Sequence, residues 1–430
     1  MFERELVVIG VHAGKYPPER STARIRSACA RLGVSHPVVN DRQFRVWRSY
    51  AVDAWPTVVL VGADGRVVGQ HAGEFEVADM AGAIRGLIEA GGAEIDLAPR
   101  SFGADPAALA EPGGPLRFPG KLLLDGETLF VSDTGHHRVL ELRLSGTGPE
   151  APRAEIVRVV GSGHSGFDDG EPADASFHSP QGLARLRADL YVADRANHAL
   201  RAIDVASGHV RTVAGTGDLA SGRMTGGPAS RTALRSPWDI APWGGAIAVA
   251  MAGAHQLWRY DPESVAIAPL AGTGGEDIAD GPAETALLAQ PMGVAAAGGA
   301  AAFCDAESSS VRMLEGSGAP AVRTVVGTGL FDFGDRDGTG DAALLQHAES
   351  VAWDGQTLVV ADTYNDKLRR IDPTTRACAS MPGDAGSGTA FEHPAGVAVA
   401  SGVIFVADTD SHRIATVDPG TGEVRTLEIV

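Results

Sequence analysis

The chain has 430 residues, of which 44% are hydrophobic and 21% charged, enough for a large core and a small additional domain. Its 54 acidic and 36 basic residues give a formal net charge of -18, which disfavours nucleic-acid binding because phosphate contacts need clustered Lys and Arg. The three cysteines are widely separated and no apolar stretch reaches the length of a membrane-spanning helix, so we expect a cytoplasmic protein without a disulfide framework or a membrane partner.

The first hundred residues alternate between strand and helix patterns. Glu3 and Glu5 lie where a signal peptide would carry Lys or Arg. In chain order, the patterns predict a strand at 6–13, a helix at 19–33, a strand at 36–41, a short helix at 45–52, a hairpin at 55–74 and a helix at 77–92. Residues 1–92 therefore predict a small α/β domain. We assign 93–114 to an interdomain linker, with the alternative that 93–102 adds a strand to the next domain.

From about residue 115 to residue 430, one pattern recurs six times. It consists of a Pro-containing strand start, an apolar strand ending in Asp, a His four residues later and a further strand, as in VSDTGHHRV, VADRANHAL and VADTDSHRI. Each unit carries four short β-branched segments between turn residues, the content of one propeller blade. Because one blade leaves both faces apolar, and a ring of six buries them, residues 115–430 predict a six-bladed β-propeller.

The repeated acidic and imidazole side chains have two interpretations. In the first, the Asp accepts hydrogen bonds from turn amides and holds the His of the next strand, so that the pairs are structural. In the second, His side chains of several blades converge on a metal ion such as zinc. We favour the structural role, since a catalytic constellation would be singular, and expect no metal. The residues concerned are Asp133, His137, Asp194, His198, His255, Asp305, Asp362, Asp408 and His412.

Positions at which the repeats differ are the better candidates for binding. The segments that open the blades read FPGK, SPQG, SPWD, QPMG, HAES and HPAG, and we expect them to feed the innermost strands beside the central channel. Blade-specific packing is the simpler interpretation, and a ligand-facing funnel is the alternative. The candidate ligand-facing residues are Lys121, Gln181, Trp238, Asp239, Met292 and Glu349.

The connections between blades carry many acids, among them Asp168, Asp169, Asp280, Asp335 and Asp337. The segment 331–341 lacks the ligand spacing and the terminal Glu of an EF-hand loop. We predict a solvated acidic rim, with weak calcium binding as an alternative.

Taken together, the Trp55-Pro56-Thr57 triplet, HPVVND, FPGK, SDTGHHR, SPQG, SPWD and AMAGAHQ resemble the NHL-repeat-containing, thioredoxin-like proteins, over essentially the whole chain. The resemblance implies a mainly β protein: a six-bladed NHL-type propeller at 115–430, preceded at 1–92 by a thioredoxin-like domain. It also implies that the peptide bond before Pro56 is cis. NHL-type propellers include the peptidylglycine amidating lyases, in which His side chains bind a catalytic metal.

One departure limits the functional inference. A thioredoxin-like domain opens with a strand and a helix that carries a C-x-x-C pair, and this sequence contains no C-x-x-C. We expect Cys29 and Cys304 to be inert packing residues, and Cys378 lies among turn residues. The domain is therefore predicted to be truncated and to lack thiol chemistry as written.

These observations favour a non-catalytic binding or scaffold protein without a cofactor, which presents a propeller face to a protein or small-molecule partner. Two enzyme alternatives remain open. One is an oxidoreductase-related protein whose redox cysteines are lost or lie upstream of Met1. The other is a metal-dependent lyase or hydrolase in the propeller channel. The sequence does not indicate an oligomeric state.

Overall fold

The computed structural model describes residues 5–73, 77–92, 113–145, 153–316, 318–382, 390–400 and 402–430. The chain forms two compact units, residues 1–110 and 111–430. The segment 93–102, for which a strand was the alternative, lies outside the described residues. No helix in the described part of the chain is long and apolar enough to cross a membrane.

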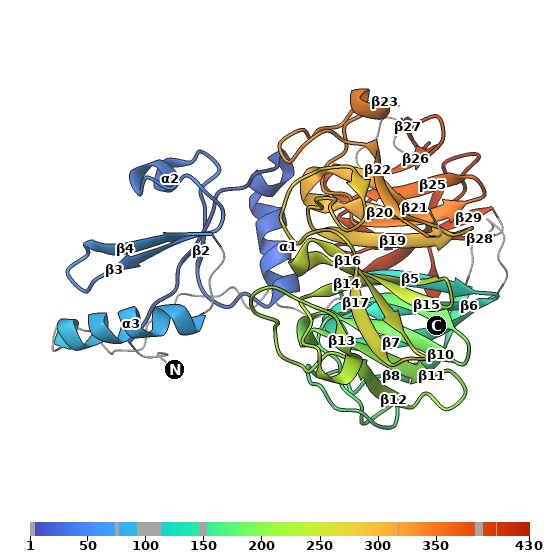
Figure 1. Cartoon of the computed structure of the whole chain (residues 1–430), viewed down its shortest axis with the longest axis horizontal. Helices are drawn as coiled ribbons and strands as arrows, with labels where there is room; N and C mark the ends of the chain where they lie inside the picture. Colours follow the sequence, from blue (N-terminus) through green and yellow to red (C-terminus); the bar gives the residue numbers. More distant parts are fainter. Residues whose placement is uncertain are drawn as a thin grey trace. The chain divides into compact units, whose positions relative to one another are not determined.

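The first unit has the predicted order of strands and helices (Figure 1). Its elements are β1 (Gly10–His12), η1 (Pro17–Arg20), α1 (Thr22–Leu32), β2 (Val38–Asn40), α2 (Arg45–Ser49), β3 (Thr57–Val61), β4 (Val67–Ala72) and α3 (Val77–Gly91). Strands β1 and β2 pair in parallel, while β3 and β4 form an antiparallel hairpin. Helix α1 ends at Gly33, whose positive φ of 67° suits a residue without Cβ. The order of elements is thus α/β, and a thioredoxin-like topology remains a prediction.

An aromatic group fixes the chain around α2. Asp41 lies before this helix, and its carboxylate accepts the backbone N–H groups of Arg45 and Trp47 in the first turn at 2.7 and 2.8 Å. Although burial opposes it, these backbone hydrogen bonds lower the pKa of Asp41. The rings of Trp47 and Trp55 lie 4.5 Å apart, and the indole of Trp55 donates to the carbonyl of Ala13 at 2.8 Å. The peptide bond between Trp55 and Pro56 is cis.

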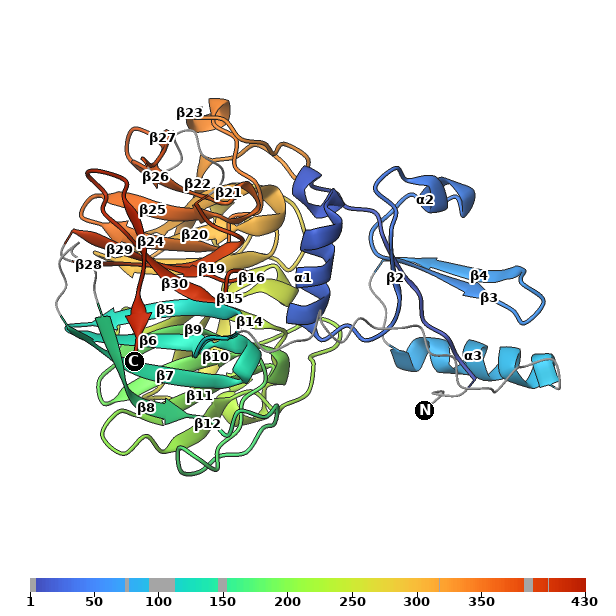
Figure 2. The same ribbon diagram turned by 180° about the vertical axis from the view of Figure 1, so that it is seen from behind.

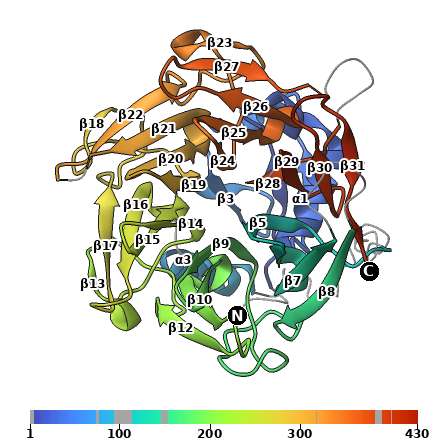
Figure 3. The ribbon, with the colours of Figure 1, turned by 90° about the vertical axis from the view of Figure 1, so that its right-hand side faces the viewer.

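The second unit is a six-bladed β-propeller, as predicted (Figure 3). Blade 1 contains β5 (Pro119–Asp125), β6 (Thr128–Asp133), β7 (Arg138–Ser145) and β8 (Arg153–Val160). Blade 2 contains β9 (Pro180–Leu186), β10 (Asp189–Asp194), β11 (Ala199–Asp204) and β12 (Val210–Ala214). Blade 3 contains β14 (Pro237–Trp243), β15 (Ala246–Met251), β16 (Gln256–Asp261) and β17 (Ala266–Ala271), with the short β13 (Gly227–Pro228) at its outer edge.

The other three blades repeat this antiparallel order. Blade 4 contains β19 (Pro291–Ala297), β20 (Ala300–Asp305), β21 (Ser310–Glu315) and β22 (Ala321–Val326), with β18 (Gly281–Pro282) outside them. Blade 5 contains β24 (Ser350–Asp354), β25 (Thr357–Asp362), β26 (Lys367–Ile371) and β27 (Ala377–Ser380), with β23 (Gly338–Thr339) outside them. Blade 6 contains β28 (Pro394–Ala400), β29 (Val403–Asp408), β30 (Arg413–Val417) and β31 (Val424–Thr426).

Short helical turns join the second and third strands of five blades and begin directly after the repeated position. They are η4 (Thr134–His136), η5 (Arg195–Asn197), η7 (Ala252–Ala254), η8 (Ala306–Ser308) and η10 (Thr363–Asn365). These turns and the starts of the innermost strands lie at the same end of the propeller, because neighbouring strands are antiparallel. We call this end the entry face. Two further turns, η6 (Ala229–Arg231) and η9 (Gly340–Ala342), lie in connections between blades.

The C-terminus closes the ring (Figure 2). Strand β32 (Glu428–Ile429) leaves blade 6 and pairs in parallel with β8, the outer strand of blade 1. Val430 donates its N–H to the carbonyl of Ala154 at 2.9 Å, and its own carbonyl accepts from Ile156 at 3.0 Å. The first and last blades are therefore joined by backbone hydrogen bonds.

Apolar side chains from neighbouring blades form the cores between them. Tyr191 of blade 2 packs in one cluster with Ile240, Ile247 and Trp258 of blade 3, and Trp258 is 0% exposed. The strands thus bury both faces, which accounts for their nearly continuous apolar sequence.

Candidate functional site

A ring of hydrogen bonds at the entry face joins each blade to the next. In every blade, a residue at the start of the third strand has φ between 48° and 54°, and its side chain accepts the backbone N–H of a residue just before the next blade. Each of these bonds is between 3.0 and 3.2 Å long. The acceptor and donor pairs are His137 and Ser179, His198 and Ser236, His255 and Gln290, Ser309 and His347, Asp366 and His393, and His412 and Phe118.

The four repeated histidines therefore lie between blades, and the last pair closes the ring. In each of them Nδ1 is the acceptor, so this nitrogen carries no proton when the bond is made. Burial, with smaller contributions from nearby cationic groups, lowers the pKa of His137 to about 4. Burial also lowers the pKa of His198 and His412.

The repeated aspartates pair with arginine, contrary to the expectation that they hold the repeated histidine. Each carboxylate accepts a backbone N–H from the segment before its own blade and a guanidinium N–H from the third strand. Arginine replaces histidine as the partner because the left-handed turn directs the imidazole to the neighbouring blade. The pairs are Asp133–Arg138, Asp194–Arg201, Asp305–Arg312, Asp362–Arg369 and Asp408–Arg413, at 2.7 to 2.9 Å.

Four of the six candidate ligand-facing residues meet at one ammonium group on the propeller axis. Lys121 of β5 is 2% exposed, and its Nζ donates to the carbonyls of Met292, at 3.0 Å, and Glu349. The same Nζ lies 3.5 Å from Oδ2 of Asp239 on β14. Burial raises the pKa of Asp239, while Lys121 and the N–H groups of Val294 and Ile240 oppose that shift. One side chain thus ties together blades 1, 3, 4 and 5.

The other two candidates lie around this group. The Trp238 ring packs with Met292, and the guanidinium of Arg195 lies 5.0 Å from its centroid. The Oε1 atom of Gln181 lies over Gly120, where a Cβ would meet it at 2.3 Å. Within the described residues, Gln181 Oε1 and Trp238 Nε1 are buried polar atoms without a hydrogen-bond partner.

A second group at the entry face was missed by the sequence analysis. The Glu349 carboxylate lies 3.4 Å from Nε2 of His393 and 3.8 Å from Nε2 of His347, and the Tyr364 ring stacks on His347 at 4.4 Å. His347 also lies 3.6 Å from Glu307. The available signal was that HAES and HPAG are the two blade openings that begin with His, and that Tyr364 is the aromatic residue among the five turns. We call Lys121, Gln181, Trp238, Asp239, Met292, His347, Glu349, Tyr364 and His393 the axial cluster.

The cysteines lack features of reactive thiols. Cys304 is 0% exposed and Cys378 3%, while Cys29 is half-buried. Burial raises the pKa of all three thiols, that of Cys378 to about 12. The placement of Cys378 among turn residues was wrong, since it lies in β27.

Two further expectations concern acids and metals. The loop acids Asp169, Asp280, Asp335 and Asp337 remain 46 to 49% exposed at their side chains, in line with the solvated rim that the sequence suggested, and each also pairs with a buried arginine. Across the described ranges, no three His, Cys, Asp or Glu side chains are arranged to hold a metal ion.

Comparisons with known proteins agree with the propeller. The NHL repeat family model matches residues 391–416, in blade 6. The chain is 36% identical over 403 residues to protein SUPPRESSOR OF QUENCHING 1, chloroplastic, of Arabidopsis thaliana, covering 89% of this chain and 37% of that protein. It is 34% identical over 412 residues to NHL repeat-containing protein 2 of Gallus gallus, covering 88% of this chain and 55% of that protein.

The similarity extends to a mammalian relative. NHL repeat-containing protein 2 of Homo sapiens is 33% identical over 420 residues, covering 88% of this chain and 55% of that protein. The chain thus spans about half the length, or less, of these relatives. The chain therefore carries an NHL repeat within a six-bladed propeller, and over most of its own length it is similar to NHL repeat-containing protein 2.

Proposed function

We propose that the chain is a non-catalytic binding or scaffold protein of the cytoplasm, whose propeller presents its entry face to a protein or small-molecule partner. The observation that carries this proposal is a division between two sets of side chains. The repeated His and Asp side chains are engaged in bonds between or within blades. The residues that do not repeat, in contrast, gather around the axis.

The chemistry of the axial cluster supports recognition. Indole, phenol, imidazole and carboxylate groups lie side by side, and such mixed aromatic and polar groups are frequent at the centre of protein interfaces. The ammonium group of Lys121 is used for bonds across the axis, so it is not poised as a base or nucleophile. The cluster therefore suits binding better than a chemical step.

The first unit supports the same proposal. Burial raises the pKa of each thiol, so none of the three is activated, and the chain has no C-x-x-C. We propose that this unit is a thioredoxin-like domain without redox chemistry in the present chain. The alternative, an oxidoreductase-related protein, is supported if the encoding gene carries an in-frame C-x-x-C upstream of Met1.

Site-directed photo-crosslinking tests the binding face. Tyr364 is replaced by p-benzoylphenylalanine in the producing organism, and adducts are identified by mass spectrometry. The matched control places the same group at Glu127, in the exposed turn between β5 and β6 at the other end of blade 1. The proposal predicts a recurring adduct from position 364 that is absent from position 127. Adducts only within the chain, or equal adducts from both positions, would contradict it.

A further inference from the structure

Blades 2, 4 and 5 share a buried polar network that ties a loop to the sheet. In each, an arginine of the third strand binds the repeated Asp and a loop Asp, and the loop Asp accepts the N–H of a residue on the fourth strand. The arginines are 0% exposed at their side chains. The networks are Arg201, Asp194, Asp169 and Thr212; Arg312, Asp305, Asp280 and Thr324; and Arg369, Asp362, Asp337 and Ser380.

Blade 3 replaces all four members of this network. Met251 takes the place of the repeated Asp, and Trp258 takes the place of the arginine. Gly226, next to β13, takes the place of the loop Asp. Trp258 pairs in register with Pro269, as Arg201 pairs with Thr212 in blade 2, so Pro269 occupies the fourth position. A change of four positions together indicates that the whole network was exchanged, since a buried charge without its partner is costly.

Replacement of the network in blade 3 removes the hydrogen bond between the loop and the fourth strand. Pro269 has no N–H to donate and Gly226 has no carboxylate to accept it. Gln256 takes over part of the bonding, because its Oε1 accepts the Trp258 indole N–H at 3.0 Å and its Nε2 donates to the Gly272 carbonyl at 2.8 Å. A cavity of about 590 Å³ lies at this seam, and Gly226, Gln256 and Pro269 are among its lining residues.

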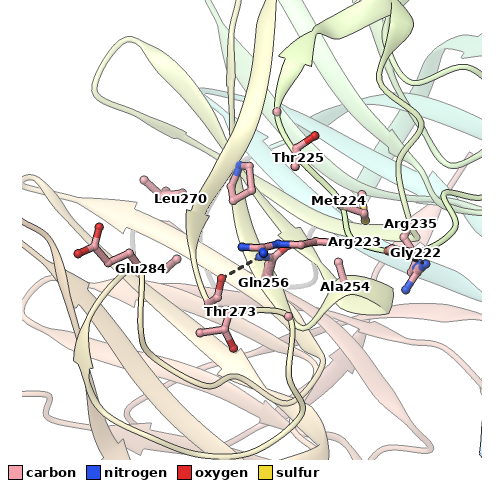
Figure 4. Close-up of a pocket in the computed structure, with 15 residues that line it drawn as sticks. Gly222, Arg223, Met224, Thr225, Arg235, Ala254, Gln256, Leu270, Thr273 and Glu284 are labelled. Atoms are coloured by element: carbon pink, nitrogen blue, oxygen red, sulfur yellow. Dashed lines mark hydrogen bonds between the residues drawn. The ribbon is translucent and has the colours of Figure 1, made fainter.

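The cavity is lined by both cationic and apolar side chains (Figure 4). Met224, Leu270 and Pro269 supply apolar surface. Arg223 is among the lining residues (Figure 4), and within the described residues its guanidinium makes no hydrogen bond or ion pair. The Arg235 guanidinium is held by the Ala220 carbonyl at 2.7 and 3.0 Å. The two guanidinium groups outnumber the single carboxylate, Glu284.

We propose that this cavity binds a small molecule that carries an oxyanion, a carboxylate or a phosphate, on an apolar body. Its volume lies within the range of about 300–1,000 Å³ that is usual for small-molecule sites. A guanidinium group binds either oxyanion with two parallel hydrogen bonds. The apolar body would lie against Met224 and Leu270, with the oxyanion at Arg223. This site is independent of the axial cluster.

Ligand-observed NMR and calorimetry on the full chain test the proposal with phenylacetate, phenyl phosphate and the neutral 2-phenylethanol. One of the two anions is expected to bind saturably and more tightly than the alcohol, and the stronger one identifies the oxyanion. Arg223→Gln should weaken its binding about five- to tenfold, the loss of one charge-assisted interaction. Arg231→Gln, which removes an exposed guanidinium from η6 on the same connection, is the matched control and should leave binding unchanged.

Two further variants guard against an indirect effect. Glu284→Gln should leave anion binding unchanged or strengthen it, because it removes the carboxylate from the cavity. Leu270→Trp should abolish binding by filling the space, with thermal unfolding measured to confirm that the variant is folded. The proposal is overturned if neither anion binds at millimolar concentration, if the alcohol binds as well as the anions, or if Arg223→Gln and Arg231→Gln behave alike.

Discussion

Replacing Lys121 by Met should destabilise the propeller strongly. Lys121 is 2% exposed and Asp239 7%, so the substitution leaves a buried carboxylate without its cation. Breaking a buried ion pair in this way costs about 3–5 kcal/mol. The loss is large compared with the usual stability of a domain, about 5–15 kcal/mol. The carbonyls of Met292 and Glu349 also lose their donor, which acts in the same direction.

Urea denaturation followed by circular dichroism measures this loss as a change in the free energy of unfolding. The double variant Lys121→Met with Asp239→Asn should recover part of the loss, because it no longer buries a net charge. A coupling energy of about 2 kcal/mol is expected between the two positions. Two results would refute the conclusion that Lys121 links the blades. One is a free energy of unfolding for Lys121→Met within about 1 kcal/mol of the parent, and the other is strict additivity of the two substitutions in the double variant.

Three other predictions follow from the same structure. The pKa of His137 is about 4 in the folded chain, against an ordinary value of 6.5, so its contribution to stability is complete above pH 6.5 and is lost as the pH falls towards 4. After discounting for partial exposure, we expect the free energy of unfolding to fall by about 1–2 kcal/mol over this pH range. Urea midpoints measured between pH 7 and pH 4 should show this loss, and the His137→Gln variant should show a smaller one. Ellman's reagent should titrate Cys304 and Cys378 only after unfolding, and rapid reaction of both in the native chain would disagree with their burial. Deleting residues 428–430 should lower the free energy of unfolding by several kcal/mol, because β8 would no longer have its backbone hydrogen bonds and apolar packing with β32, and an unchanged value would exclude this closure of the ring.

The sequence predicted the repeats better than their connections. In blade 1, for example, the Pro marks the start of β5 and the repeated Asp marks the end of β6. Both signals are readable in the sequence because they follow from local backbone chemistry. The partner of the repeated Asp was wrong because a left-handed residue decides where His137 points, and backbone handedness at a histidine is not visible in a pattern of residue types. The repeated arginine was overlooked because it lies five residues after the Asp in blades 1 and 6 but seven residues after it in blades 2, 4 and 5.

The candidate site was predicted in part. Lys121, Asp239 and Glu349 were found because they break the repeat at blade openings. Their convergence on one ammonium group was not predictable, since it depends on the closing of a ring across distant segments. His347, Tyr364 and His393 were missed because their convergence on Glu349 depends on the same closing of the ring, although the two openings that begin with His and the aromatic turn residue were visible in the sequence. The sequence shows that blade 3 departs from the repeat, because Met251 stands in place of the repeated Asp. The cavity could not be predicted, because it depends on where the loop at residues 222–226 lies in the fold.

The metal content of the purified full chain tests the central claim most directly. The claim is that the repeated imidazole and carboxylate groups hold the blades together and perform no chemistry. After equilibration with zinc and gel filtration, elemental analysis by mass spectrometry should find far less than one zinc ion per chain, with no difference between the parent and a His198→Gln variant. One zinc ion per chain in the parent, lost in that variant, would contradict the claim.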